Sequence, residues 1–384
     1  MNKRLTGKTV LVTGATGFIG GRLVERLVSL EGARVRALVH TMGNAVRIAR
    51  LPVELIRGDL LDLDSLRSAA QGCDVIFHCA YGSSGNDEER RQVNVDGTRN
   101  VLQAALEAGV RRVVHFSTVA VHDVDHSGVV DETAPYATQG DVYTLSKIEA
   151  EKVVFAYQRD NGLEVVVLRP PVVYGPYAPY WTVAQIECIK NGNFTLVEDG
   201  QGTCNPIYVD DVVAASTLAA VHPGADGEAF IIANNPTTWR EVFGYYLQMV
   251  GKSQVPNWEM AEWQAVRRAQ RIVGYRLGRQ VARLGSPRVR QIARQAFLLG
   301  KVYKLISNSL PTRLKRQMLA PFERLYWQKR EPQRIPSPAE MAFFTARTVY
   351  DGRKARECLG FQPRVSLDRG MRLTEEWLNY KGLL

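Results

Sequence analysis

A tyrosine and a lysine four residues apart, Tyr143 and Lys147, are well suited to acid–base chemistry. At this spacing two side chains lie on the same helix face, one turn apart. A tyrosine with its ordinary pKa of about 10 is a poor base near neutrality, but an adjacent ammonium group favours the phenolate and lowers that pKa. Tyr143 can then take or give a hydroxyl proton while a hydride is transferred elsewhere. Because this pattern is common on helices, its meaning depends on its neighbours.

A threonine completes the candidate catalytic set. Thr118 follows the β-branched run 113–117, which predicts a buried strand, and a helix is predicted over 144–160. Ligands of parallel α/β sheets bind at the carboxyl ends of the strands. We therefore expect the Thr118 hydroxyl to hold a substrate oxygen beside Tyr143.

A glycine-rich segment, residues 13–20, lies between a predicted strand at 9–12 and a predicted helix at 21–30. In such a segment Gly14 permits a tight turn, Gly17 lets the backbone approach a pyrophosphate, and Gly20 allows close helix packing. The order strand, loop and helix indicates a dinucleotide site for NADP or NAD. The candidate cofactor-binding residues here are Gly14, Ala15, Thr16, Gly17, Phe18, Ile19 and Gly20.

The end of the second predicted strand carries no carboxylate. NAD-specific sites place Asp or Glu there to bind the ribose hydroxyls, whereas this chain has His40, with Arg47 nearby. Without that carboxylate the site does not repel a 2′-phosphate, and Arg47 can pair with one, so we predict a preference for NADP(H). The alternative is that Arg47 is an ordinary solvated residue.

Two further strand ends supply candidate cofactor contacts. Asp59, followed by Leu60, is placed to accept a hydrogen bond from the adenine amino group, and Ala80 and Tyr81 would lie along the cofactor. The alternative is that these are ordinary strand-end residues.

Short β-branched runs alternate with helical patterns over the first 120 residues. This alternation predicts an α/β fold, a Rossmann-type doubly wound parallel sheet with a smaller discontinuous substrate domain and a basic helical insert. The predicted NAD(P)-binding domain comprises 1–175 and 205–234. The predicted substrate domain comprises 176–204 and 235–384.

The net charge of +10 comes from one segment of the 384-residue chain. Residues 264–330 hold 17 of the 49 basic residues and one of the 39 acidic ones, so this segment carries +16 and the remainder −6. Apolar residues recur at helical spacing in 265–284 and 289–306, which predicts cationic amphipathic helices. This insert either packs on the second domain, docks on an anionic membrane, covers a lipophilic substrate or fits a partner protein. It contains no recognisable nucleic-acid-binding module, so nucleic acid is a weak alternative.

Several motifs, in order, resemble those of the extended short-chain dehydrogenase/reductases, the NAD-dependent epimerase/dehydratase and hydroxysteroid dehydrogenase-like group. The resemblance implies that Tyr143 is the acid/base, that Lys147 binds the nicotinamide ribose, that Thr118 is the hydroxyl partner, and that Pro170 to Val173 lie near the nicotinamide. The stretches that carry the resemblance are Thr13–Gly20, Phe77–Ala80, Asn94–Thr98, Phe116–Thr118, Tyr143–Lys147, Arg169–Pro176, Tyr208–Asp211 and Asp351–Pro363.

Two departures from that family bear on the substrate. Val119 and Ala120 stand where sugar dehydratases carry Asp and Glu, and Cys204 stands where many nucleotide-sugar members carry an Arg that clamps the diphosphate. We therefore expect an oxidoreductase that acts on a secondary alcohol or ketone of a lipophilic or lipid-linked substrate. A nucleotide-sugar 4-epimerase that retains NAD is the alternative, and a non-catalytic redox sensor or scaffold is a third.

The remaining features place the enzyme in the cell. Five scattered cysteines without a C-x-x-C pair are typical of a reducing compartment. The sequence contains no uninterrupted apolar run of 18 residues, so it does not predict a membrane-spanning helix. We expect a cytoplasmic enzyme, peripheral on the inner face of a membrane if the insert docks there, with a possible homodimer as its assembly and no metal.

Overall fold

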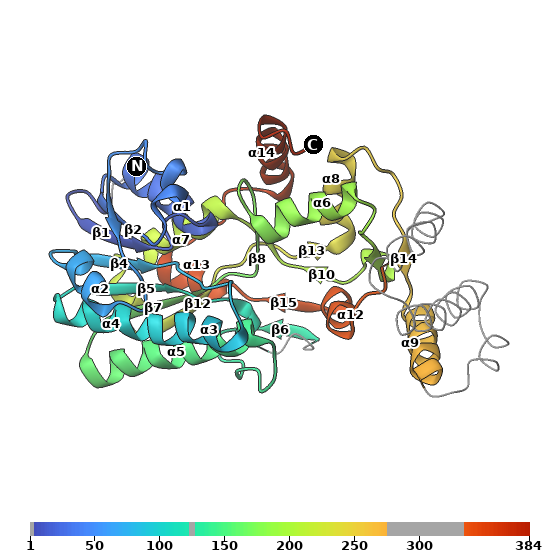
Figure 1. Ribbon diagram of the computed structural model, residues 1–384, viewed down its shortest axis with the longest axis horizontal. Helices are drawn as coiled ribbons and strands as arrows, with labels where there is room; N and C mark the ends of the chain where they lie inside the picture. Colours follow the sequence, from blue (N-terminus) through green and yellow to red (C-terminus); the bar gives the residue numbers. More distant parts are fainter. Residues whose placement is uncertain (1–3, 123–126, 275–333) are drawn as a thin grey trace, which may run out of the picture. The chain divides into compact units, whose positions relative to one another are not determined.

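The computed structural model describes residues 4–122, 127–274 and 334–384. A seven-stranded parallel sheet with the strand order β12-β7-β5-β4-β1-β2-β3 forms its centre (Figure 1). The predicted Rossmann-type fold is confirmed, because strands and helices alternate as the sequence pattern requires. The strands are β1 (Thr9–Thr13), β2 (Arg34–Val39), β3 (Val53–Arg57), β4 (Val75–His78), β5 (Arg112–Phe116), β7 (Glu164–Arg169) and β12 (Glu228–Ile231).

Helices cover both faces of this sheet. On one face α1 (Phe18–Arg26) packs against α7 (Val209–Ala219), and on the other α4 (Gly97–Glu107) packs between α2 (Leu63–Ala70) and α5 (Val142–Asn161) (Figure 1). The inner strands β1, β4, β5 and β7 are buried along nearly their whole length, as expected for a parallel sheet that is covered on both sides, whereas the edge strand β3 has no buried residue.

The chain divides into two compact units, the first comprising residues 1–186, 203–237 and 346–384 and the second 187–202 and 238–345. The first unit contains the sheet and every predicted catalytic and cofactor residue. The C-terminal segment 346–384 belongs to this unit because β15 (Thr348–Tyr350) pairs with β6 (Gly128–Val130), whereas the division predicted from the sequence assigned it to the substrate domain. The separate roles of the two predicted domains stay a prediction.

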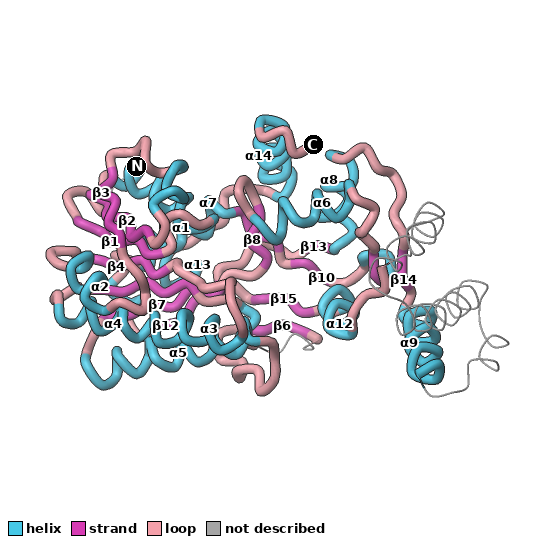
Figure 2. Tube along the Cα trace, viewed as in Figure 1, coloured by secondary structure: helices cyan, strands magenta, loops and turns pink. Residues whose placement is uncertain are grey.

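Shorter elements complete the first unit (Figure 2). Strand β8 (Val172–Tyr174) pairs in parallel with β11 (Pro206–Tyr208). The other elements that lie entirely in it are the helices α3 (Asp87–Arg91), α13 (Arg353–Leu359) and α14 (Leu367–Tyr380), the strand β10 (Thr203–Cys204), and the short helical turns η1 (Leu27–Glu31), η2 (Met42–Arg47), η3 (Gln92–Asp96), η4 (Val119–Val121), η5 (Pro179–Val183) and η7 (Pro223–Ala225).

The second unit has an aromatic core in which Trp239, Phe243 and Phe344 are in mutual contact. Its elements are β9 (Leu196–Val197), η6 (Glu198–Gly200), α8 (Trp239–Met249), β14 (Asn257–Trp258), α9 (Met260–Gly274) and α12 (Pro338–Thr345). Helix α6 (Ala184–Lys190) and strand β13 (Thr237–Thr238) each cross the boundary between the units. Among the described residues no helix is both long enough and apolar enough to span a membrane.

Candidate active site

Helix α5 positions the tyrosine and the lysine. It begins after Asp141, whose carboxylate caps the helix by accepting a hydrogen bond from the Thr144 amide at 2.9 Å. It ends at Gly162, which adopts the left-handed conformation (φ 68°) that glycine tolerates. Tyr143 therefore lies in the first turn and Lys147 one turn later, on the same face.

The structure brings the three predicted catalytic residues together at the carboxyl end of β5. The Thr118 side chain lies near the Tyr143 hydroxyl and opposes the rise in the pKa of that phenol. The Lys147 Nζ donates to the carbonyl of Phe116, the last residue of β5, at 2.7 Å. Thr118 and Lys147 are both 7 % exposed, so both side chains are largely shielded from solvent at the end of the strand.

Burial sets the protonation of this group. It lowers the pKa of Lys147 to about 8, against the opposing charge of Glu151 one turn further along α5. Burial also raises the pKa of Tyr143, against the nearby Thr118 side chain, which favours the phenolate. At neutral pH the site therefore holds a protonated tyrosine beside an ammonium group, which is the form that can donate a proton to a developing alkoxide.

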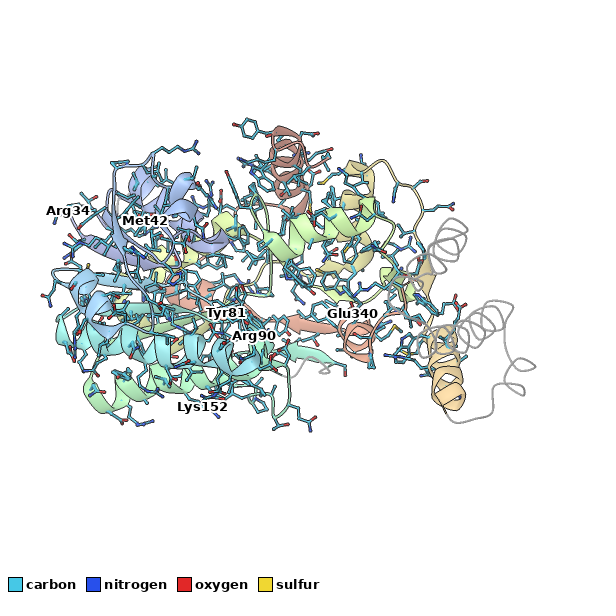
Figure 3. All side chains as sticks on the ribbon, viewed as in Figure 1. Arg34, Met42, Tyr81, Arg90, Lys152 and Glu340 are labelled. Atoms are coloured by element: carbon cyan, nitrogen blue, oxygen red, sulfur yellow. The ribbon has the colours of Figure 1, made fainter. Side chains whose placement is uncertain are left out.

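Tyr81 contacts both catalytic side chains, which the sequence did not predict. Its ring meets that of Tyr143 edge to face at 5.1 Å, and Lys147 Nζ lies 5.4 Å from its centroid; Figure 3 labels Tyr81 beyond the end of β4. Gly82, the residue after Tyr81, is held by Asn94, whose side chain accepts a hydrogen bond from the Gly82 amide (2.7 Å) and donates one to the Gly82 carbonyl (3.1 Å). The Asn94–Thr98 stretch was the one signal in the sequence that pointed to this arrangement.

Two buried histidines lie beneath the site. The His78 ring bridges the hydroxyls of Thr13 (2.7 Å) and Thr98 (3.0 Å), and it lies 5.3 Å from the ring of His115 on the adjacent strand. Burial, and then the charge of Lys147, lowers the pKa of His78 to about 3 and that of His115 well below its ordinary value. Both rings are therefore neutral at physiological pH and add no charge that would compete with the ammonium.

The glycine loop fits a dinucleotide. Gly14 has φ 65°, and a Cβ there would lie 2.6 Å from the Ala80 amide nitrogen, while a Cβ at Gly20 would collide with the Gly14 carbonyl. Gly17, at the N-cap of α1, carries no side chain that could satisfy the first amides of the helix. Ala15 and Thr16 lie in the loop before the helix, and the Gly17 amide donates to the Gly14 carbonyl at 3.0 Å. The amides of Phe18 and Ile19 begin the helix, where a helix N-terminus can bind an anion.

The predicted specificity residues do not lie together. The Arg47 guanidinium pairs with Glu25 on α1 at 2.8 Å, and its side chain is only 10 % exposed. His40 is largely exposed and instead lies 3.2 Å from the carboxylate of Asp59. A carboxylate therefore lies beside the end of β2, although it comes from the loop after β3.

The other predicted cofactor contacts have structural partners as well. The Leu60 carbonyl accepts from Asn100 of α4 at 2.9 Å, and the Pro170 carbonyl accepts from the Val119 amide at 3.2 Å, next to Thr118. Val173 is buried in β8. Cys204 is fully buried, and burial raises the pKa of its thiol, so this position offers no charge to a phosphate. How these residues contact the cofactor stays a prediction.

Comparisons with known proteins agree with this geometry. The model of the NAD dependent epimerase/dehydratase family matches residues 10–233. A 2-alkyl-3-oxoalkanoate reductase from Shewanella oneidensis is 30% identical over 62% of this chain, which spans 65% of that relative's length. A 4-hydroxy-2-methyl-3-oxo-4-farnesyl-3,4-dihydroquinoline-1-oxide ketoreductase from Stigmatella aurantiaca is 32% identical over 70% of this chain and 86% of its own.

Solved structures share the fold over nearly the whole chain. A UDP-glucuronic acid 4-epimerase from Bacillus cereus in complex with NAD superposes with a TM-score of 0.67 at 19% identity, covering 97% of this chain and 99% of its own. At that identity the match supports the architecture alone.

Proposed function

This chain belongs to the NAD dependent epimerase/dehydratase family and is an enzyme of the extended short-chain dehydrogenase/reductase type that uses NAD or NADP, and we propose that it interconverts a secondary alcohol and a ketone on a lipophilic substrate. When bound, the cofactor supplies or accepts the hydride. Thr118 holds the substrate oxygen, Tyr143 gives that oxygen its proton, and the Lys147 ammonium favours the phenolate that results.

The observation that carries this proposal is the buried grouping of Thr118, Tyr143 and Lys147. The apolar nature of the substrate is inferred from two further features. Cys204 is buried where a diphosphate-binding arginine would be required, and two relatives act on molecules whose names include alkyl and farnesyl groups.

A nucleotide-sugar 4-epimerase that retains NAD is the second candidate, because it uses the same three side chains and a family member with this fold has that activity. Mass spectrometry of ligands that remain bound through native purification separates the two. We expect the purified protein to carry less than one cofactor per chain, because a reductase releases and rebinds NAD(P)(H) in each turnover. Tightly retained NAD together with a sugar nucleotide would contradict the reductase proposal.

The preference for NADP(H) is a separate prediction. To bind a 2′-phosphate, Arg47 must give up Glu25, and the phosphate must tolerate Asp59 beside His40. We therefore expect the Glu25→Gln variant, which frees Arg47, to raise the affinity for NADPH relative to NADH, because a guanidinium–phosphate pair contributes about 1.5–3 kcal/mol. Fluorescence titration of both reduced cofactors measures this ratio, and Glu54→Gln, which removes an exposed partner of Arg36 on β2, is the control. A wild-type protein that binds NADH more tightly would contradict the predicted preference.

We also propose that the basic insert, residues 264–330, docks the enzyme on an anionic membrane surface. Most of the insert lies outside the described residues, but the segments that flank it are hydrogen-bonded to each other. The Trp258 indole donates to the Arg334 carbonyl at 3.0 Å, and the Trp263 indole donates to the Pro336 carbonyl at 2.8 Å. Each basic residue near an anionic surface contributes about 1 kcal/mol, so a few of the 17 are enough for binding.

Co-sedimentation with vesicles checks the membrane proposal. We expect binding to vesicles of phosphatidylglycerol and phosphatidylcholine that disappears at high salt, and none to phosphatidylcholine alone. Replacing Arg276, Arg279, Arg283 and Arg288 by Gln should weaken this binding by up to about 1,000-fold, since four contacts of about 1 kcal/mol each are lost. The control, Arg159→Gln with Arg353→Gln, removes exposed arginines outside the insert. Equal binding by the two variants would mean that the insert does not dock on lipid.

A further inference from the structure

Tyr177, in the loop after β8, joins three segments that are distant in the sequence. Its ring stacks under the Arg47 guanidinium, whose central carbon lies 4.0 Å from the ring centroid, and it packs against the indole of Trp377 in α14 at 4.8 Å. The Lys381 ammonium lies 5.7 Å from the same ring. Neither the glycine loop nor the catalytic set requires these contacts.

The backbone at Tyr177 is held in an unfavourable conformation. Its φ of 68° places a bulky residue in the left-handed region, which costs of the order of 1–3 kcal/mol and persists only where the surroundings impose it. Hydrogen bonds on either side fix the turn, from the Ala178 amide to the Gly175 carbonyl (3.1 Å) and from the Gly175 amide to the Thr182 hydroxyl (3.3 Å). The loop therefore presents the Tyr177 ring to Arg47 at an energetic cost.

Arg47 lies along α1 (Phe18–Arg26), from the first residue of the helix to Glu25 near its end. It donates to Glu25 at 2.8 Å and to the Phe18 carbonyl at 3.4 Å, and a Cβ on Gly21 would lie 3.0 Å from its Nη1. Of these contacts, the one to the Phe18 carbonyl lies at the start of the helix, next to the amides that can bind a pyrophosphate. Tyr177 thus reaches the glycine loop through the guanidinium.

The direction of this contact matters. A dinucleotide extends from the end of β2, where its adenosine half binds, past the N-terminus of α1 to the nicotinamide half near the catalytic residues. Arg47 follows β2 and Tyr177 follows β8, so a contact between them at the start of α1 crosses the path of the cofactor. We propose that Arg47, Tyr177 and Trp377 form a clasp that closes over the cofactor pyrophosphate and must open each time the cofactor enters or leaves.

The side chain of Trp377 adds a second role for the clasp. Within the described part of the chain its buried indole N–H has no hydrogen-bond partner, and a buried donor without a partner costs free energy. The clasp therefore offers an anionic ligand a spare donor, in Trp377, beside an Arg47 guanidinium that is already paired with Glu25.

Stopped-flow release of NADH and NADPH from the full-length protein tests the clasp. We expect Tyr177→Ala to speed release about ten-fold, because a desolvated cation–π contact is lost, and Trp377→Leu to speed it by a smaller factor. Tyr177→Phe keeps the ring and should match wild type within two-fold. Tyr380→Ala, which removes an 84 % exposed ring on the same helix, is the matched control.

Two outcomes would overturn the clasp. Release rates of Tyr177→Ala and Trp377→Leu that equal that of Tyr380→Ala would mean that the cluster only joins α14 to the sheet, and the two variants would then differ in melting temperature alone. Release that speeds equally in Tyr177→Phe would assign the effect to the hydroxyl rather than the ring. The inference rests on the cofactor site of the proposed function but not on its substrate. Failure to reduce any ketone would contradict the reductase proposal and leave the release rates interpretable.

Discussion

Replacement of Tyr143 by Phe is expected to reduce kcat for ketone reduction by about 100- to 10,000-fold, the usual contribution of a positioned acid or base. The reason is the geometry at the end of β5. Thr118 acts on the Tyr143 hydroxyl, and Lys147, one turn along the helix, is held at the Phe116 carbonyl; the variant removes the one proton that this group is arranged to deliver. Cofactor affinity should stay within two-fold of wild type, because the glycine loop is untouched.

Another tyrosine of the same helix provides the matched control for this experiment. Tyr157 donates from its hydroxyl to Gln103 of α4 at 3.0 Å, four turns away from the site, so Tyr157→Phe should keep kcat near that of wild type. The measurement is single-turnover oxidation of NADPH or NADH with an alkyl 3-oxo acid as the ketone, followed by nicotinamide absorbance. A Tyr143→Phe variant that turns over as fast as Tyr157→Phe would contradict the catalytic assignment.

The sheet and the catalytic pair were predictable because both depend on local patterns. Buried parallel strands read as β-branched runs, and a spacing of four places two residues on one helix face whatever packs around them. The strand predicted at 75–78 is β4 itself, and the helix predicted at 144–160 lies within α5. The grouping with Thr118 followed from one rule, that parallel strands end at the same edge of the sheet.

The parts that could not be predicted depend on contacts between residues far apart in the sequence. Nothing near Arg47 indicates that Glu25, 22 residues earlier, takes up its charge. Nothing near Tyr177 indicates that Trp377, 200 residues later, packs on it. The prediction of a preference for NADP(H) was limited for the same reason. The sequence shows which residue follows a strand, but it does not show whether the side chain of that residue is already paired with another group.

A buried ion pair joins the catalytic helix α5 to strand β7. Arg169, at the end of β7, binds Glu151 of α5 through two hydrogen bonds of 2.6 and 3.0 Å, and both side chains are under 5 % exposed. The Tyr136 hydroxyl also donates to Glu151 at 2.8 Å. Such a pair can contribute little net stability while both partners are present, yet the loss of one partner leaves a buried charge without compensation. The same Glu151 favours the charged form of Lys147, so the pair connects the stability of the fold to the catalytic group.

We therefore expect Arg169→Leu to lower the free energy of unfolding by about 3–5 kcal/mol, since it leaves the Glu151 carboxylate buried and unpaired. The double variant Arg169→Leu/Glu151→Leu should recover most of this loss, because the unpaired Glu151 carboxylate is then absent. Urea unfolding followed by circular dichroism measures both free energies. The control, Arg159→Ala on the exposed face of α5, is expected to change the free energy of unfolding by less than about 0.5 kcal/mol.

The double variant also separates stability from catalysis. It should fold, but its Lys147 loses the nearby negative charge, so the pKa of Lys147 falls further below its ordinary value. As the pH is raised, the rate should therefore begin to decline at a lower pH than in wild type. A double variant as unstable as Arg169→Leu would show that packing rather than charge holds α5 to β7, and an unchanged pH profile would show that Glu151 does not act on Lys147.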